Sequence, residues 1–309
     1  MNGKRGFALV IALVVTALVT ALVVTFINEV YLETGTHHNA VAAQQGSLFA
    51  EGGITGALQL LTTTTSSQSY SSLNDVWAKP LAFDEERGSL RITIEEENGK
   101  LNLNLIALPN GQFNEEYKGI GQRLLTRLKQ PSDLLDSLAD WIDTDDSPHP
   151  GGAESAWYQG RKVKYRPRNK PLETFEELNR IRGFTPELVE QLRPFTTVYG
   201  DQPGVAVAAP ININTAPREL LLALDEGMTE SLAEQIIAYR LTTPFKTPAE
   251  LVKVPGMQTI ATALQTRIVT KGSVYRIRSE ATVNDVTRTI EAVARINGGT
   301  STIIYWREY

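Results

Sequence analysis

The feature that most constrains this chain is an uncharged apolar run close to its N-terminus. Residues 7–27 carry no charged side chain, and three threonines are their only polar members. As a helix, these 21 residues span roughly 30 Å, the thickness of the hydrocarbon core of a bilayer. Lys4 and Arg5 precede the run and Glu29 and Glu33 follow it, so the positive-inside rule places the N-terminus in the cytoplasm. The sequence therefore predicts one membrane-spanning helix with the bulk of the chain on the far side.

Composition excludes several kinds of function for the remainder of the chain. With no cysteine and only three histidines, it can form no disulfide framework, no cysteine-ligated zinc site and no thiol nucleophile. The net charge of −5 provides no overall positive field for nucleic acid. Carboxylates without a histidine partner or a nucleophile suit binding better than turnover, so an enzyme is the weaker hypothesis and we expect none.

The residues before the apolar run indicate how the N-terminus is processed. A cleavable secretory signal has a shorter apolar stretch and an Ala-x-Ala-like site, whereas Lys4-Arg5-Gly6-Phe7 is a short basic leader ending in glycine. This leader resembles the type III signal of type IV pilins and type II secretion pseudopilins. The resemblance implies that prepilin peptidase cuts between Gly6 and Phe7 and methylates the new N-terminus. A simple membrane anchor is the alternative.

One position in the apolar run departs from most pilins. By resemblance, the fifth residue after the cut is a glutamate that pairs with the terminal amine of a neighbouring subunit, but here it is Ile11. A carboxylate in lipid is costly unless it is paired, so a subunit without it does not neutralise the amine of a subunit ahead of it. Ile11 is therefore the position that indicates a place at the tip of a filament.

Hydrophobic periodicity outlines the rest of the fold. The apolar pattern predicts a helix that continues to about residue 61, followed by a Thr/Ser-rich loop over 62–72. Alternating residues around Asn98-Gly99 predict a β-hairpin made of residues 90–94 and 101–105. Further strands are predicted at residues 275–283, 290–296 and 302–306. Because a lone hairpin is marginal in water, we expect both groups to join one sheet against the N-terminal helix.

The segment between the two groups of strands reads as an all-helical insertion with an internal repeat. Thr-x-x-Glu-Leu, then an aliphatic residue and glycine, begins at Thr174 and again at Thr247, and each copy starts as a capping box. The predicted fold is α+β: a long transmembrane helix packed on a small antiparallel, pilin-like sheet, with two similar helical bundles inserted. The expected parts are a leader at 1–6, a transmembrane helix at 7–27, a pilin-like domain at 28–105 and 273–309, and bundles at 106–200 and 201–272.

A cluster of carboxylates in the first bundle predicts a cation site. Asp140, Asp143, Asp145 and Asp146 lie within seven residues, and Glu154 returns after a Pro/Gly turn. Like charges crowded in this way repel unless a hard cation lies among them, and calcium takes six to eight oxygen ligands. Asp143, Asp145 and Glu154 are the predicted core ligands of Ca²⁺, with Asp140 and Asp146 as ligands or neighbours. A solvated acidic surface is the alternative.

The second bundle also allows a different function. Its sequence resembles helix-hairpin-helix proteins, which include membrane-anchored DNA receptors, and such hairpins bind phosphate through backbone amides of a glycine turn. The first turn here reads Leu-Asp-Glu-Gly-Met and ends at Met228, so two carboxylates stand where phosphate would approach. A protein-contact module is the better interpretation of the bundle.

Four motifs in order resemble one family, the minor pseudopilin K family of type II secretion systems. They are the glycine-terminated leader, Gly-Lys-Leu-Asn-Leu-Asn-Leu at 99–105, the acidic string Ala-Asp-Trp-Ile-Asp-x-Asp-Asp with its Gly-Gly-Ala-Glu return, and Ile-Asn-Thr-Ala-Pro-Arg-Glu-Leu at 213–220. The resemblance implies a tip subunit that nucleates pseudopilus assembly for export of folded periplasmic proteins. It implies I-, J- and H-type minor pseudopilins, prepilin peptidase and the inner-membrane platform as partners, with calcium bound at the acidic loop. A minor pilin of a type IV pilus remains the second alternative.

Overall fold

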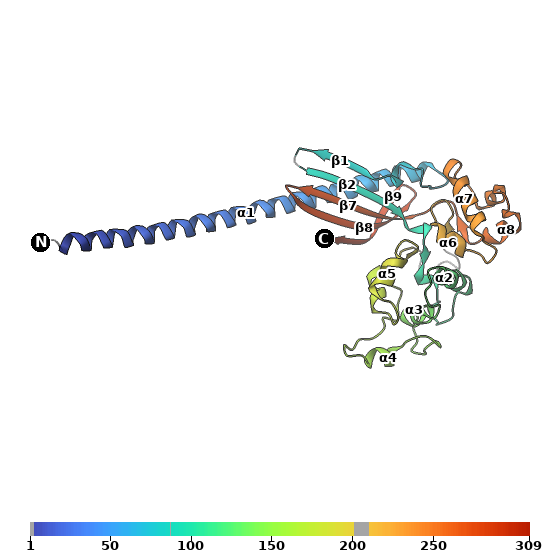
Figure 1. Cartoon of the computed structure of the whole chain (residues 1–309). Coiled ribbons are helices and arrows are strands. Elements are labelled where there is room, and N and C mark those ends of the chain that lie inside the picture. Colours follow the sequence, from blue (N-terminus) through green and yellow to red (C-terminus); the bar gives the residue numbers. More distant parts are fainter. Residues whose placement is uncertain (1–2, 87, 201–209) are drawn as a thin grey trace.

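The computed structural model describes residues 3–86, 88–200 and 210–309, with side chains described from Phe7 onward. One long helix leads from the N-terminus into an antiparallel sheet, and a mainly helical body lies at the end of the sheet that is far from the N-terminus (Figure 1). The α-helices are α1 (Gly3–Ser67), α2 (Glu115–Arg127), α3 (Leu134–Ile142), α4 (Ser155–Gln159), α5 (Pro186–Leu192), α6 (Arg218–Ala223), α7 (Glu230–Thr242) and α8 (Ala261–Leu264).

Helix α1 has two halves in different surroundings. Its first half is exposed throughout and contains the span long and apolar enough to cross a membrane. In its second half the buried face consists mainly of small residues at helical spacing, among them Ala42, Ala50 and Ala57, with Ile54 and Leu61. This narrow face lets the helix lie close to the sheet, and the two share one hydrophobic cluster. The predicted α+β fold with a long N-terminal helix is confirmed.

The predicted loop over 62–72 is wrong in its first half, because α1 continues to Ser67. Thr63, Thr64 and Thr65 each donate their hydroxyl group to the carbonyl oxygen four residues earlier, at 2.8, 2.7 and 2.7 Å. These bonds satisfy the hydroxyls inside the helix, so a threonine run that is typical of loops adds another turn here.

The sheet has five antiparallel strands in the order β1-β2-β7-β8-β9. The strands are β1 (Leu81–Glu85), β2 (Gly88–Glu96), β7 (Val274–Val283), β8 (Val286–Asn297) and β9 (Thr300–Glu308). The three predicted C-terminal strands are confirmed as β7, β8 and β9. Asn284 and Asp285 both have positive φ, 45° and 67°, in the two-residue turn between β7 and β8, which is the geometry of a type I′ turn.

The predicted hairpin around Asn98-Gly99 is wrong. Strand β2 pairs with β1 and β7, whereas Leu101–Asn102 forms β3 and pairs in parallel with β4 (Thr196–Thr197). The amide oxygen of Asn98 accepts bonds from the backbone N–H groups of Ser273 and Val274, both at 2.9 Å. Asn98 thus joins the two ends of the insertion, and the chain after it enters the helical body instead of turning back along β2.

The insertion consists of two related units, the first inserted unit (residues 99–200) and the second inserted unit (residues 210–271). Asn104 accepts from the amide of Leu172 at 2.7 Å and donates to two carbonyl oxygens. Asn214 accepts from the amide of Phe245 at 2.8 Å and also donates to two carbonyl oxygens. Each asparagine closes its unit beside a short parallel ladder, β3–β4 in the first and β5 (Ile211–Asn212) with β6 (Ile268–Val269) in the second.

The predicted sequence repeat corresponds to these two units, although the segments that follow Thr174 and Thr247 form short 3₁₀ turns instead of α-helices. The capping box of Thr174 and Glu177 is present, while Thr247 makes no capping hydrogen bond through its side chain. Both units share one hydrophobic cluster, and Arg123 of α2 donates to the carbonyl oxygen of Ala223 at 2.7 Å. The insertion is therefore one body made of two related halves. The 3₁₀ turns are Val76–Ala78, Glu97–Gly99, Leu103–Leu105, Phe175–Arg180, Pro248–Lys253 and Met257–Thr259.

A pair of adjacent glycines in α1 gives a matched test of the helix–sheet packing. A Cβ atom at Gly53 would overlap the Ser279 hydroxyl and approach Leu90 and Ile92, whereas a Cβ at Gly52 meets nothing within 4 Å. We expect Gly53→Ala to destabilise the full-length chain in detergent by about 1–3 kcal/mol, the cost of overpacking. Gly52→Ala should stabilise it by up to about 1 kcal/mol, because alanine favours helix. Thermal unfolding checks both, and equal shifts would contradict the close packing.

Candidate metal centre

The acidic cluster lies where α3 ends. Asp143 follows the last residue of α3, and its ψ of −179° takes the chain out of its helical path. Thr144 then donates its backbone N–H and its hydroxyl to the carbonyl oxygen of Pro109, at 3.0 and 2.7 Å. These bonds fix the loop against a second segment that includes Gly111, at which a Cβ atom would lie 2.9 Å from Asp145 and 3.3 Å from Asp143. Gly111 thus lets backbone approach both carboxylates closely.

Three of the predicted ligands meet in one place. One carboxylate oxygen from each of Asp143, Asp145 and Glu154 lies within 4.8 Å of the other two. Asp143 is fully buried, Glu154 is 4% exposed, and Asp145 faces solvent. All four side-chain oxygens of Asp143 and Glu154 lack a hydrogen-bond partner among the described residues. Buried carboxylate oxygens are costly to leave unpaired, so these four atoms indicate a missing ligand.

The charges of the cluster agree with this interpretation. Burial, together with Asp145 and Asp140, raises the pKa of Asp143 to about 6. Burial, followed by Asp140, Asp143 and Asp146, raises the pKa of Glu154 to about 8. Both carboxyl groups are therefore destabilised in their ionised form when no cation is bound. A divalent cation would remove this penalty, and an all-oxygen donor set fits a hard ion such as calcium.

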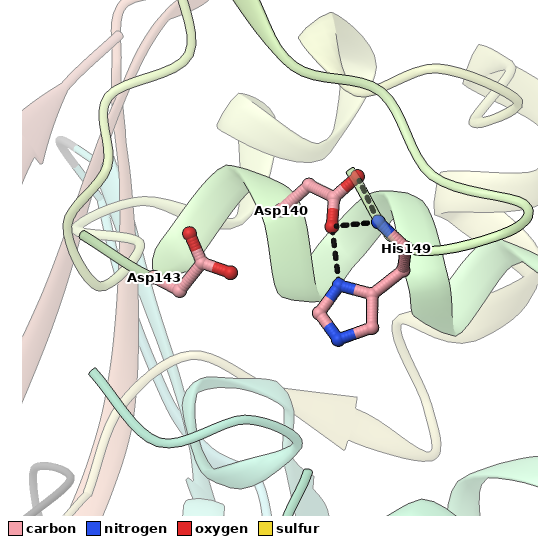
Figure 2. A group of neighbouring side chains, drawn as sticks. All are labelled: Asp140, Asp143 and His149. Carbon is pink, nitrogen blue, oxygen red and sulfur yellow. Dashed lines mark hydrogen bonds and ion pairs between the residues drawn. The ribbon is translucent and has the colours of Figure 1, made fainter. Parts of the chain in front are cut away.

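Asp140, three residues before Asp143 and within α3, belongs to a second group that shares Asp143. Its Oδ1 atom is 2.5 Å from Nδ1 of His149, and the backbone N–H of His149 donates to the same oxygen at 3.1 Å (Figure 2). Asp140, Asp143 and His149 also bring three possible ligand atoms within 4.8 Å of one another. A Cβ atom at Gly152 would overlap the Asp140 carboxylate, so the Gly-Gly return is needed for the loop to close here.

The remaining predicted residue, Asp146, lies at the edge of the cluster, close enough to Glu154 to raise the pKa of that carboxyl group. Asp146 is exposed and accepts from the backbone N–H of Ser155 at 3.1 Å, which anchors the start of α4. His149 was not predicted from the sequence, where it stands between two prolines nine residues after Asp140. Spacing alone could not show that the turn folds its ring back onto α3.

The N-terminal candidates lie at the opposite end of the molecule. Phe7 and Ile11 belong to the first turns of α1, and their side chains are 69% and 47% exposed. Gly6 is part of the same helix. No side chain of the described residues covers the apolar window of α1, which is the condition of a helix whose partner is lipid or another subunit.

The turn proposed for phosphate binding in the DNA-receptor hypothesis is already satisfied internally. Asp225 accepts from the backbone N–H of Gly227 at 2.9 Å, and its other oxygen pairs with Arg267 at 2.8 Å. The backbone N–H of Met228 donates to the carbonyl oxygen of Asp225 at 3.1 Å. A phosphate at this turn would therefore meet a carboxylate and amides that already have partners, which disfavours DNA binding here.

Comparisons with known proteins agree with this architecture. Family profiles described as type II secretion system (T2SS), protein K match residues 99–201 and 211–271. A type II secretion system protein K from Pseudomonas aeruginosa is 28% identical over 249 residues, covering 75% of this chain and 72% of that protein. One from Klebsiella pneumoniae is 26% identical over 279 residues, covering 84% and 82%.

A solved structure has the same fold. It belongs to the GspK–GspI–GspJ complex of the enterotoxigenic Escherichia coli type 2 secretion system. The matched chain superposes with a TM-score of 0.71 at 22% identity, covering 90% of this chain and 99% of that one.

A long N-terminal helix with an apolar first half packs its second half on an antiparallel sheet, and an insertion lies between β2 and β7. These features define a pilin-like subunit with an enlarged head, formed by the two inserted units. The matched profiles lie within the insertion, and the relatives cover most of both chains. This chain belongs to the type II secretion system protein K family and is a minor pseudopilin, a structural component of the secretion machine. The family resemblance predicted from the four sequence motifs is confirmed.

Proposed function

We propose that this minor pseudopilin occupies the tip of the pseudopilus and nucleates its assembly. The observation that carries the proposal is the pairing of two features at opposite ends of the chain. Ile11 provides no carboxylate for the amine of a subunit ahead of it, and the inserted body lies beyond the end of the sheet that is far from the N-terminus (Figure 1). A subunit with both features can end a filament. It has no carboxylate to bind the amine of a further subunit, and its inserted body would obstruct the stacking of one above it.

The partners and orientation follow from this position. The N-terminus lies in the cytoplasm, α1 crosses the inner membrane, and the sheet and insertion lie in the periplasm, as the flanking charges indicate. I- and J-type minor pseudopilins contact the subunit at the tip, with an H-type subunit beneath, and the inner-membrane platform drives assembly. The matched chain was solved in a GspK–GspI–GspJ complex, which supports the I- and J-type partners. The subunit acts by binding and has no enzymatic role.

The acidic cluster has a structural role in the same proposal. Calcium is held by Asp143, Asp145 and Glu154, with Asp140 and His149 beside them. Carboxylates from both sides of the turn would then share one ion, which fixes the loop after α3 against α4. The four unpartnered oxygens of Asp143 and Glu154 support this role.

The tip position can be tested by introducing the missing carboxylate. We expect Ile11→Glu to leave the subunit at one end of the pseudopilus, because the inserted body still prevents stacking above it. The measurement is electron microscopy of labelled subunits in cells that overproduce pseudopili, with Val10→Glu as a control one position away. Labels repeated along the shaft in the wild type would refute the tip position. Labels along the shaft only in Ile11→Glu would show that the insertion does not prevent stacking.

A further inference from the structure

Two consecutive buried glutamates lie at the junction between the sheet and the insertion: Glu96 is the last residue of β2, and Glu97 begins the 3₁₀ turn that follows it. The carboxylate of Glu97 pairs with Lys100 at 3.1 Å and Arg276 at 3.0 Å, and it accepts from the hydroxyl of Thr197 in the first inserted unit. Burial acts to raise its pKa, but Lys100 and Arg276 hold the pKa of Glu97 below its ordinary value. Glu97 is thus a charged, permanently paired attachment of the first inserted unit.

Glu96 makes the corresponding attachment of the second inserted unit without a cation. Its oxygens accept from Ser71 Oγ at 2.6 Å, Asn212 Nδ2 at 2.6 Å and Thr215 Oγ1 at 3.1 Å. No Lys or Arg of the described residues forms an ion pair with it. Burial raises its pKa to about 7, against the effect of the three hydrogen bonds, and Asp75 raises it further.

The groups packed around Glu96 are neutral or negative, apart from Lys100, which pairs with other glutamates. The segment after α1 contributes Ser71 and Asp75. Strand β7 contributes Tyr275, whose hydroxyl donates to the carbonyl oxygen of Gly272. The second inserted unit contributes the amide of Asn212 and the hydroxyl of Thr215, which carry no charge. The nearby charges on its own segment are Glu95, Glu97 and Lys100, and the ammonium of Lys100 is bound to both of these glutamates.

The contacts of Glu96 connect three segments that are distant in sequence. Ser71 donates its backbone N–H to the carbonyl oxygen of Thr270 at 2.9 Å, and its hydroxyl oxygen accepts from the backbone N–H of Gly272 at 2.8 Å. A Cβ atom at Gly272 would overlap the Glu96 carboxylate, so the returning chain packs directly against it. A cavity of about 300 Å³ lies at this junction and is lined in part by Trp77, Glu96 and Thr215.

We propose that Glu96 is a proton-dependent latch, which holds the second inserted unit on the sheet when neutral and loosens it when ionised. The paired Glu97 holds the first inserted unit at all pH values in the physiological range. The direction follows from linkage. The folded pKa of about 7 lies above the ordinary 4.5, so the closed junction loses stability as pH rises from 4.5 to about 7 and changes little above that.

Hydrogen exchange of the full-length chain in detergent micelles between pH 5 and pH 8 tests the latch. After correction for intrinsic exchange rates, opening at the amides of Ser71 and Gly272 should increase by about fifty- to a hundredfold over this range and level off above pH 7. The amide of Leu101, which donates to the carbonyl oxygen of Phe195 in the first inserted unit, should show no such change. Glu96→Gln should remove the pH dependence, and Glu95→Gln, a neighbouring exposed carboxylate, should leave it in place.

A second variant keeps the test decisive if Glu96→Gln folds poorly. Thr215→Val removes one hydrogen bond to the carboxylate, so it should raise the pKa of Glu96 and move the levelling-off to a higher pH. Protection at Ser71 and Gly272 that does not change with pH in the wild type would overturn the proposal. So would a pH dependence that survives in Glu96→Gln, or one shared equally by Leu101, which would indicate global unfolding.

Discussion

Calcium is expected to raise the unfolding temperature of the full-length chain in detergent by roughly 5–10 °C at a hundredfold excess over its Kd. A ligand that binds only the folded form stabilises it by RT ln(1 + [L]/Kd), about 2.7 kcal/mol at that excess. For a chain of this size each kcal/mol corresponds to roughly 2–4 °C. Magnesium should have a smaller effect, because its octahedral hydration shell is lost reluctantly. Thermal unfolding in EDTA, magnesium and calcium gives the comparison.

The effect of substitutions at this site on stability should reverse between metal-free and calcium-containing buffer. In EDTA, Asp143→Asn and Glu154→Gln should be as stable as the wild type or more so, because each removes a buried charge whose ionisation is disfavoured. In calcium both should fall below the wild type and lose most of the rise. Asp84→Asn, an exposed carboxylate on β1, serves as the control and should follow the wild type in both conditions. An unchanged wild-type melting curve in calcium, with no metal in the purified protein, would return the cluster to plain acidic surface.

The second large effect concerns the leader. In cells that contain prepilin peptidase, the mature chain should begin at Phe7 with a methylated amine. Gly6→Leu should leave residues 1–6 attached and abolish assembly, because the bulky side chain replaces the glycine at the predicted cut. Gly3→Leu is the matched control, since it adds the same side chain to the same leader three residues earlier.

Mass spectrometry of the intact protein distinguishes the outcomes of this experiment. Normal processing of Gly3→Leu together with uncut Gly6→Leu supports the assignment. A mature chain that begins near residue 28 would instead mean an ordinary signal peptide. Uncut wild-type protein would leave a simple membrane anchor as the correct interpretation.

Sequence patterns predicted correctly those elements whose structure depends on neighbouring residues alone. The alternation of β7 and β8, with Asn284-Asp285 between them, specifies a hairpin without help from other segments. The same reasoning failed at Asn98-Gly99, where an equally good turn sequence is used differently. The backbone N–H groups of Ser273 and Val274 bind the side chain of Asn98, and that long-range contact is invisible to a pattern of alternating residues.

The candidate site shows the same limit. Asp143, Asp145 and Glu154 could be predicted as one group from the sequence, because a helix end and a Pro/Gly turn restrict where the loop can go. It did not include His149, whose ring reaches Asp140 only because the turn folds back over α3. Nor did it decide whether Asp146 is a ligand or a neighbour; this residue accepts a hydrogen bond from the first amide of α4 and also acts on Glu154. Burial and hydrogen-bond partners decide such roles, and neither can be read from spacing.

The register of β2 with β7 has a consequence for how the chain reaches its fold. Glu96 lies opposite Tyr275 in this pair, so every residue of the insertion forms the connection between two adjacent strands. In an unfolded chain, closing so long a connection is entropically costly and slow. Once the insertion has folded, its two ends are already side by side, because Asn98 binds the amides of Ser273 and Val274. If the insertion folds first, it shortens the effective connection between β2 and β7, and destabilising substitutions in its core should then also impair formation of the sheet.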